Sequence, residues 1–417
     1  MVKGRGGRLE KRRIDGHSVN MLIKTEPMDA SLQFCPNPAC SASGLIEGGN
    51  IRIHDRKRER YRCTLCRRTF TARTGTMLEG LRKPAELIII VVGLLSYGCP
   101  LQAIVHVFGV DERTVAAWRD RAGHHCQSVQ RAIIEQGQLA LTHVQADEIR
   151  VRGKKEIFWM GLAMEVSSRL WLAGIVCAAR DQVLADRLML RVRRCTSGAC
   201  RLLICVDGWM CYPAAILRAF SQQVKHKLQV WPQLIIGQVI KTQKHYHLES
   251  VKQTLLCGEE KGLKACLEQS QGGTQINTAF IERLNGTMRE RLASLTRKCR
   301  HANWQLSAFE WGMYLIGCTY NLCFPHHELS KNKHLGSPCT PAMAAGLTDH
   351  AWSMKEVLTY KVTPQLRAKA KEDALQELAP PLPVPRLSKS VRGNPSPAYL
   401  ALLRLKAREA GLSSITT

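Results

Sequence analysis

The chain has 417 residues and carries 60 lysines and arginines against 34 aspartates and glutamates, so its formal net charge is +26. This excess predicts a polyanionic partner, and it favours nucleic acid over a membrane surface because no long amphipathic basic stretch occurs. The longest apolar run, at 87–95, is far below the roughly 20 residues of a membrane span. No hydrophobic signal segment is found at the N-terminus, which favours a cytoplasmic protein.

A length of roughly 150 residues per domain predicts about three domains. Residues 1–30 are basic and polar without periodicity, so we expect a flexible arm there. Seventeen cysteines in a long chain without a signal segment favour reduced thiols over disulfides, with metal ligation where the spacing allows it.

Two cysteine pairs follow the arm. Cys35 and Cys40 are separated by four residues, Cys63 and Cys66 by two, and 22 residues lie between the pairs. Two such knuckles form a tetrahedral thiolate site, which is a geometry that zinc prefers. We therefore predict a zinc ribbon at 31–80 in which these four cysteines bind Zn²⁺. Four unrelated core thiols are the alternative.

Residues 81–140 are predicted to form a helix-turn-helix DNA-binding domain. Apolar residues at helix spacing over 101–108 are followed by Gly109 and by a second helix with Asp111 as its N-cap. The helical spacing assigns two side chains to the core and two to a DNA groove: Val115 and Trp118 face inward, and Arg113 and Arg119 face DNA. A plain helical hairpin within a core is the alternative.

From residue 141 the pattern changes to strands separated by short polar turns. The predicted elements are strands at 144–151, 157–166 and 170–178, a helix at 181–194, a strand at 202–207, a helix at 212–220 and a strand near 234–240. This order, closed by a helix around position 282, is that of a ribonuclease H-like α/β fold with a mixed five-stranded sheet and flanking helices. We therefore predict such a domain at 141–325 and expect 242–275 to be a polar insertion.

Three carboxylates of this domain are candidates for one catalytic site. Asp147 and Asp207 stand at the polar ends of apolar β-type runs, and Glu282 opens a helix-patterned stretch. Two divalent cations about 3.5–4 Å apart, held by hard oxygen ligands, can activate a water or a 3′-hydroxyl in phosphodiester chemistry. We predict that the three acids are catalytic and bind Mg²⁺ or Mn²⁺. Taken singly, each acid has an ordinary alternative as a turn former or part of a solvated face.

The helix around Glu282 carries further polar side chains. Asn285 at i+3 and Arg289 at i+7 project from nearly the same face, and Arg297 and Lys298 add positive charge beyond them. Such a face suits a phosphate backbone, so we predict that these four residues bind DNA. The alternative is an ordinary surface helix with paired charges.

These segments resemble the DDE-class transposases of bacterial insertion sequences. Within this class, the chain is similar to the insertion-sequence-one family, with its N-terminal zinc finger and helix-turn-helix. The resemblance covers roughly residues 31–345. Its most specific pieces are Gln145-Ala-Asp147-Glu, Val206-Asp207-Gly-Trp and Ile281-Glu282-Arg-Leu-Asn285, with Arg289, Arg297 and Lys298.

The resemblance implies Mg²⁺-dependent cleavage and transfer of DNA strands at terminal inverted repeats, with the three acids as metal ligands and the helix after Glu282 holding the DNA end. Double-stranded DNA would be the partner, paired ends would require at least a dimer, and the protein would associate with the nucleoid through DNA. Two other functions stay open. One is a DNA-binding regulator or decayed element whose catalytic domain no longer reacts, and the other is a structure-specific nuclease of the same fold.

The remaining chain carries weaker signals. We predict a C-terminal segment at 326–365, a Pro-rich linker at 366–396 and a basic helical tail at 397–417. Two further cysteine pairs, at 195/200 and 318/323, lack a partner pair and are expected to be free thiols.

Overall fold

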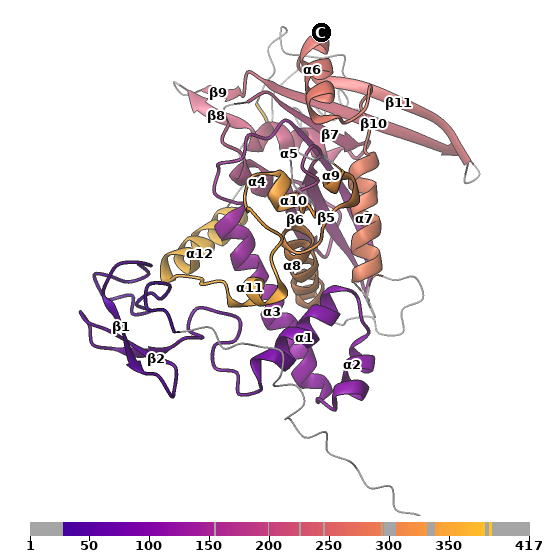
Figure 1. The fold of residues 1–417 in the computed structure, drawn as a ribbon. Coiled ribbons are helices and arrows are strands. Elements are labelled where there is room, and N and C mark those ends of the chain that lie inside the picture. Colours follow the sequence, from indigo (N-terminus) through magenta and orange to yellow (C-terminus); the bar gives the residue numbers. More distant parts are fainter. Residues whose placement is uncertain are drawn as a thin grey trace, which may run out of the picture. The chain divides into compact units, whose positions relative to one another are not determined.

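The structure of the chain is a computed structural model, drawn in Figure 1. It describes residues 28–153, 156–198, 200–224, 227–244, 247–292, 295, 306–331, 338–379 and 383–385. Most of the expected arm, the expected basic tail, Arg297 and Lys298 lie outside these residues. The chain divides into two units between Ala72 and Arg73. Within the described ranges, no helix is both long and apolar enough to cross a membrane.

The first unit is built around a small antiparallel sheet. The strand order is β1-β2-β3, with β1 (Ile51–Asp55), β2 (Arg60–Cys63) and β3 (Thr69–Thr71). Tyr61 and Phe70 stack with their ring centroids 6.0 Å apart, and they pack in one cluster with the four cysteines of the predicted metal site. The thiols therefore make up a large share of this small core.

The second unit begins with three helices, α1 (Ala85–Ser96), α2 (Leu101–Phe108) and α3 (Glu112–Ile133). Gly109 ends α2 with a φ of 61°, a left-handed conformation that glycine adopts without a Cβ clash. The Asp111 side chain caps α3 by accepting hydrogen bonds from two backbone N–H groups of its first turn. The helices, the turn and the cap expected from the sequence are all observed.

Helix α3 is longer than the sequence pattern indicated. Val115 and Trp118 are buried, as expected, but the helix continues for 22 residues and packs along α8 (Leu306–Leu322). Gly123 permits this approach, because a Cβ there would lie 2.2 Å from the backbone oxygen of Trp311. The helical segment is thereby joined to the α/β part of the unit.

A six-stranded mixed sheet forms the centre of the second unit. Its order is β11-β10-β7-β4-β5-β6, with β4 (His143–Arg152), β5 (Ile157–Glu165), β6 (Trp171–Cys177), β7 (Leu202–Asp207), β10 (Leu234–Lys244) and β11 (His247–Cys257). Strand β7 runs parallel to β4 and β10, and the other neighbours are antiparallel.

The prediction of five strands is therefore wrong by one. Residues 247–257 were expected within a polar insertion, but they form β11, which pairs with β10 in a long hairpin (Figure 1). Only the inner end of β11, at 254–257, is buried, whereas 249–253 are exposed. The outer half therefore lacks the apolar signal on which the strand prediction depended.

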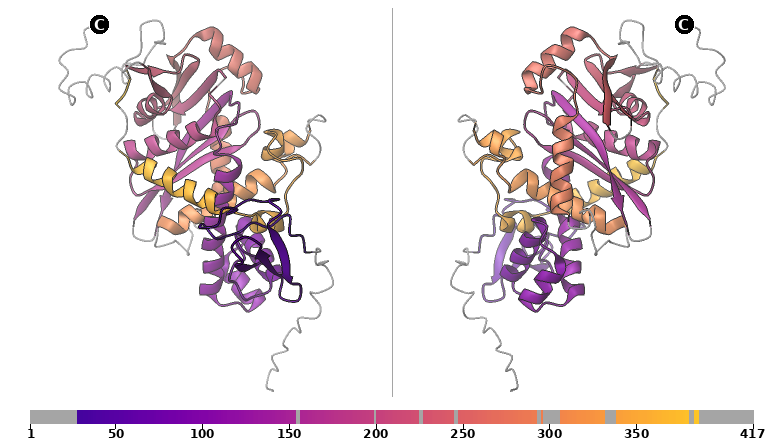
Figure 2. Two further views of the ribbon diagram at one scale, coloured as in Figure 1. Left: turned by 90° about the vertical axis from the view of Figure 1, so that its left-hand side faces the viewer. Right: turned by 90° about the vertical axis from the view of Figure 1, so that its right-hand side faces the viewer.

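Helices cover both faces of the sheet, as Figure 2 shows. Helices α4 (Gln182–Cys195) and α5 (Cys211–Ala219) pack on one face, and α6 (Glu260–Ser270), α7 (Ala279–Arg291) and α8 pack on the other. Two glycines of the sheet allow helices to pack closely, one on each face. A Cβ on Gly161 of β5 would touch Leu184 of α4, and a Cβ on Gly174 of β6 would lie 2.5 Å from the sulfur of Met313 in α8.

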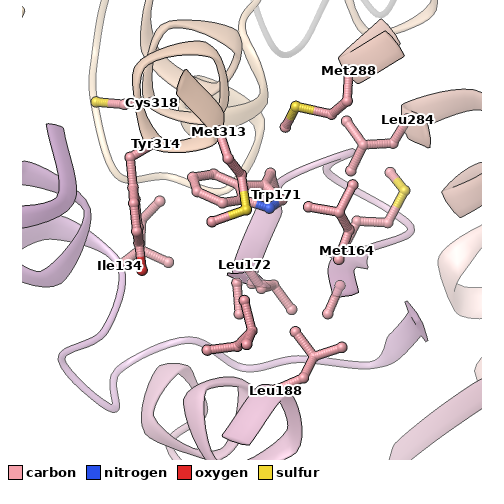
Figure 3. Close-up of a cluster of buried hydrophobic side chains, with 14 of the residues drawn as sticks. Ile134, Met164, Trp171, Leu172, Leu188, Leu284, Met288, Met313, Tyr314 and Cys318 are labelled. Atoms are coloured by element: carbon pink, nitrogen blue, oxygen red, sulfur yellow. The ribbon is translucent and has the colours of Figure 1, made fainter. Parts of the chain in front are cut away.

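The core between the sheet and α8 is organised around Trp171. This side chain is fully buried and lies beside Met313, with Leu284 and Met288 of α7 close by (Figure 3). Asn321 accepts a hydrogen bond from the Trp171 N–H at 2.9 Å and donates to its carbonyl oxygen at 2.8 Å. The outer edge of β6 is thus covered by helix α8 at this point.

Short elements complete the unit. They are the hairpin β8 (Ser221–Val224) and β9 (Lys227–Val230), and the helices α9 (His327–Ser330), α10 (Pro341–Ala344), α11 (Met354–Thr359) and α12 (Pro364–Leu378). Helix α12 falls where a Pro-rich linker was expected from residue 366. Thr363 caps it, Pro364 takes its first turn, and the proline-rich composition begins only after residue 379.

Candidate active site

Five charged side chains meet in one pocket of the second unit. The pocket has a volume of about 550 Å³, lies at the carboxyl end of β7, and is lined by Asp147, Arg180, Asp207, Lys241 and Glu282. Strands β4, β7 and β10 run parallel, so they point toward the same edge of the sheet. This is where open α/β sheets commonly bind ligands. The three predicted acids therefore share one pocket.

Asp147 lies on β4 just past the last pair of the ladder between β4 and β7, Ala146 with Val206. Its Oδ1 accepts a hydrogen bond from the backbone N–H of Glu148 at 2.8 Å, and its Oδ2 accepts one from Nδ2 of Asn285 at 2.8 Å. Burial and the neighbouring Asp207 carboxylate raise the pKa of Asp147 to about 6. A carboxylate in this position is stabilised by any nearby cation.

Asp207 is the last residue of β7. Its Oδ1 accepts a hydrogen bond from the backbone N–H of Trp209 at 2.9 Å, and its Oδ2 lies 3.5 Å from Nη2 of Arg180. Burial raises the pKa of the Asp207 carboxyl, although the Trp209 N–H and the Arg180 and Lys241 cations oppose the shift. Both aspartates are thus poorly solvated acids within reach of the same space.

A fourth carboxylate, Glu148, joins the cluster, and no role was assigned to it from the sequence. Oxygen atoms of Asp147, Glu148 and Asp207 all lie within 4.8 Å of one another. Neighbouring residues on a strand point to opposite faces. The carboxylates of Asp147 and Glu148 nevertheless approach each other, at the point where the ladder between β4 and β7 ends. The signal available in the sequence was the position of Glu148 directly after Asp147.

The Glu148 side chain is held from two sides. It is 2% exposed, its Oε2 accepts a hydrogen bond from the Tyr212 hydroxyl at 3.0 Å, and its Oε1 forms an ion pair with Arg180. Burial and the Asp207 charge raise the pKa of Glu148 to about 7. Unlike Asp147, Glu148 does not line the pocket.

Glu282 lies in the first turn of α7 and lines the pocket together with Asp147 and Asp207. Its side chain is 46% exposed, it pairs with Lys241 of β10, and its Oε1 accepts a hydrogen bond from the Thr278 hydroxyl at 2.7 Å. Although partial burial raises the pKa of Glu282, these contacts with Lys241 and Thr278 lower it overall. Glu282 is not part of the three-acid group whose oxygens lie within 4.8 Å.

Gln145 fixes α7 against β4, a role that was not predicted. Its side-chain oxygen accepts hydrogen bonds from the backbone N–H groups of Phe280 and Ile281, each at 3.0 Å, and its Nε2 donates to Asn277 at 3.1 Å. The first N–H groups of a helix have no partner within the helix, so a side chain from another element can satisfy them. Because Gln145 is two residues before Asp147, it sets the position of Glu282 relative to that acid.

The residues predicted to bind DNA from α7 are placed differently from one another. Asn285 is 2% exposed and donates to Asp147, so it supports the carboxylate and is not open to a DNA backbone. Its spacing to Glu282 led to the prediction, but the helix turns position 285 toward β4. Arg289 is exposed and lies close enough to oppose the rise in the pKa of Asp147. Arg297 and Lys298 lie outside the described residues.

The two groove-facing arginines predicted in α3 also differ. Arg113 is exposed in the first turn of the helix. Arg119 is 19% exposed and forms an ion pair with the adjacent Asp120 at 2.7 Å. Arg121 donates to the backbone oxygens of Met77 and Glu79, so it holds the helix to the preceding loop. Of the two predicted residues, Arg113 is the more accessible to a ligand.

A second cluster of possible metal ligands lies in the first unit. The sulfur atoms of Cys35, Cys40, Cys63 and Cys66 all lie within 4.8 Å of one another, with 3.5 Å between Cys35 and Cys66 and 3.9 Å between Cys40 and Cys63. Although burial raises the pKa of the Cys63 thiol, hydrogen bonds from the Cys66 N–H and the Asn50 side chain lower it to about 6. Four converging thiols, one with a low pKa, can bind a metal ion.

The two cysteine pairs expected to be free thiols form no further metal cluster within the described ranges. Cys195 and Cys318 are buried, Cys323 is half-buried, and Cys200 is exposed.

Comparison of the sequence with protein-family models yields no match, and comparison with curated proteins yields none either.

Proposed function

We propose that this chain is a DNA transposase of the DDE class, which cleaves DNA strands and transfers them at the ends of its own insertion sequence. The observation that supports this most is the meeting of Asp147 and Asp207 at the carboxyl end of parallel strands, with Glu282 lining the same pocket. The mixed α/β sheet with helices on both faces is compatible with the ribonuclease H-like fold in which such acids act, with β11 as an additional strand.

The donor atoms of the pocket are carboxylate oxygens, which suit Mg²⁺ or Mn²⁺. Asp147, Asp207 and Glu282 would hold these ions, and a bound pair of cations would supply the positive charge that phosphodiester cleavage and strand joining require. The chain's own residues keep the acids in place. Asn285 orients Asp147, the Trp209 N–H orients Asp207, and Gln145 fixes the start of α7, which carries Glu282.

The rest of the chain fits a protein that binds DNA ends. The soft four-sulfur donor set of the first unit suits Zn²⁺, and we propose that the unit is a zinc ribbon. Seven exposed basic residues of this unit would contact phosphates: Arg52, Arg56, Lys57, Arg58, Arg62, Arg67 and Arg68. We also propose that α2 and α3 act as a helix-turn-helix, with Arg113 at the DNA, and that at least two copies of the chain assemble on paired ends.

A DNA-binding protein without catalysis is the second candidate. Lys241 pairs with Glu282, and Arg180 pairs with Glu148 and Asp207, so protein cations already offset part of the acidic charge. Such a regulator would need no metal in this pocket. A nuclease of the same fold is distinguished by its products, because it would cut DNA without joining strands.

The deciding experiment is a strand-transfer assay with purified protein, Mg²⁺ or Mn²⁺, and duplexes that carry the flanking ends of its own gene. Asp207→Asn removes one metal-ligating charge at nearly constant size. Glu290→Gln is the matched control, because Glu290 is an exposed acid on α7 outside the pocket. Joined products from the wild type and from Glu290→Gln, with none from Asp207→Asn, would support the transposase. Binding without cleavage would favour the regulator, and cleavage without joining would favour the nuclease.

A further inference from the structure

We propose that Arg180 binds the phosphate group of the substrate in this pocket, and that Glu148 is the residue that positions Arg180 and not a metal ligand. This inference rests on the proposed function, because it concerns the same pocket. It assigns separate tasks to two acids that are adjacent in sequence: Asp147 would hold a metal ion, and Glu148 holds a protein cation.

Arg180 is fixed in a way that an ordinary surface arginine is not. It lies in the loop between β6 and α4, directly before the helix cap Asp181. Its guanidinium carbon is 4.7 Å from the ring centre of Trp209 and 5.2 Å from that of Trp159, so two aromatic side chains restrict it. Trp159 of β5 and Trp209 of the loop after β7 therefore hold this side chain at the pocket.

Both ion-pair contacts of Arg180 use the same nitrogen. Nη2 pairs with Oε1 of Glu148 and lies 3.5 Å from Oδ2 of Asp207. No described residue forms a hydrogen bond with Nε or Nη1. The side chain is 34% exposed and lines the pocket, so these atoms can be reached by a ligand. A guanidinium has five N–H donors in a planar fork that fits phosphate oxygens, so Arg180 retains donors for a ligand in the pocket.

Glu148 is suited to holding Arg180 and poorly suited to holding a metal ion. Its side chain is almost fully enclosed, one oxygen already accepts from Tyr212, and the other is engaged by Arg180. A metal ion would have to replace the arginine to reach it. Asp147 and Asp207, in contrast, line the pocket directly.

The charge in the pocket explains why an arginine is needed. A phosphodiester that approaches Asp147, Asp207 and Glu282 brings a negative charge toward three others. The reaction exchanges one phosphorus–oxygen bond for another and concentrates negative charge on the non-bridging oxygens at the transition state. Arg180 would donate hydrogen bonds to one of these oxygens without forming any covalent bond.

Metal affinity separates the two roles. Mn²⁺ alone is titrated into the full-length wild type, Asp207→Asn, Glu148→Gln and Arg180→Gln, and the heat of binding is measured. We expect Asp207→Asn to weaken Mn²⁺ binding at least about tenfold and both other variants to bind no more than about twofold more weakly than wild type. An effect of Glu148→Gln as large as that of Asp207→Asn would overturn the inference and make Glu148 a ligand. No Mn²⁺ binding by the wild type would instead count against the proposed function.

Phosphate contact is tested on the duplexes described above. In Ca²⁺, the logarithm of affinity is followed against the logarithm of salt concentration, and Arg180→Gln should reduce the slope by about 0.9, as expected for one lost phosphate contact. In Mg²⁺, cleavage should fall about a hundredfold for Arg180→Gln and about tenfold for Glu148→Gln. Arg193→Gln is the matched control, because Arg193 also stacks on a tryptophan, Trp231, outside the pocket.

Two results would overturn the assignment of Arg180. One is an unchanged salt slope together with unchanged cleavage in Arg180→Gln. The other is an equal loss of cleavage in Arg193→Gln, which would indicate a general effect of removing positive charge. If the wild type itself does not cleave these duplexes in Mg²⁺ or Mn²⁺, the proposed function fails, and that outcome is separate from either result on Arg180.

Discussion

Glu377, near the end of α12, allows a quantitative test of what holds the second unit together. Its carboxylate lies 2.9 Å from Arg191 and 2.7 Å from Arg194, both on α4, and its side chain is buried. Although burial raises the pKa of Glu377, these two guanidinium groups lower it overall, to about 2 from an ordinary value of 4.5. At about 1.36 kcal/mol per pKa unit, the shift corresponds to about 3 kcal/mol.

We therefore expect Glu377→Gln to lower the free energy of unfolding by about 3 kcal/mol at neutral pH. The folded-state pKa lies below the unfolded-state value, so this stabilisation is complete above pH 4.5 and is lost as the pH falls toward 2. Urea unfolding followed by tryptophan fluorescence, at neutral pH and near pH 3, measures both effects. Glu328→Gln is the control, because its pair with Lys331 is exposed and should contribute nothing measurable.

Two outcomes would refute this reasoning. Equal unfolding midpoints for the wild type and Glu377→Gln at neutral pH would mean that the arginines do not stabilise the folded state through this carboxylate. A difference that stays constant on acidification would mean that the variant acts through packing of α12 and not through charge.

Three further predictions concern the acidic pocket and the four-cysteine cluster. Gln145→Ala should lower strand transfer about tenfold with an unchanged circular dichroism spectrum, because α7 loses its side-chain cap and Glu282 its fixed position. Cys63→Ser should release zinc, measured by atomic absorption, and should unfold the first unit while the second unit keeps its melting transition. A normal zinc content in this variant would contradict the zinc ribbon. Mn²⁺ at a hundredfold excess over Kd should stabilise the wild type by about 2.7 kcal/mol, seen as a higher Tm, and Asp207→Asn should show a smaller shift.

The strands of the second unit were predictable where their apolar pattern is local. β4, β5, β6, β7 and β10 each carry a continuous or alternating apolar run, and all five were expected near their observed positions. β11 was missed because its outer half is exposed and it is held by pairing with β10. Helix α12 was missed because the proline-rich stretch after it was assigned to the same segment.

The candidate site was predictable in part for a similar reason. Asp147 and Asp207 could be found because an apolar run precedes each of them in the sequence, and their proximity follows from the fold implied by that order of elements. Arg180 and Lys241 could not be found, because nothing in the local sequence of either residue indicates which acid it meets. Their partners come from strand and helix pairings between residues far apart in the chain.

Much of the site depends on the short strand β4. Its odd-numbered residues face α6 and α7: His143 contacts Ser270, Gln145 caps α7, and Asp147 accepts from Asn285. Its even-numbered Glu148 faces α5 through Tyr212. Because side chains alternate between faces, a slip of one residue in the pairing of β4 would exchange these two sets and remove Asp147 from Asn285 and Gln145 from α7. The positions of the acids relative to one another are therefore fixed by the register of β4.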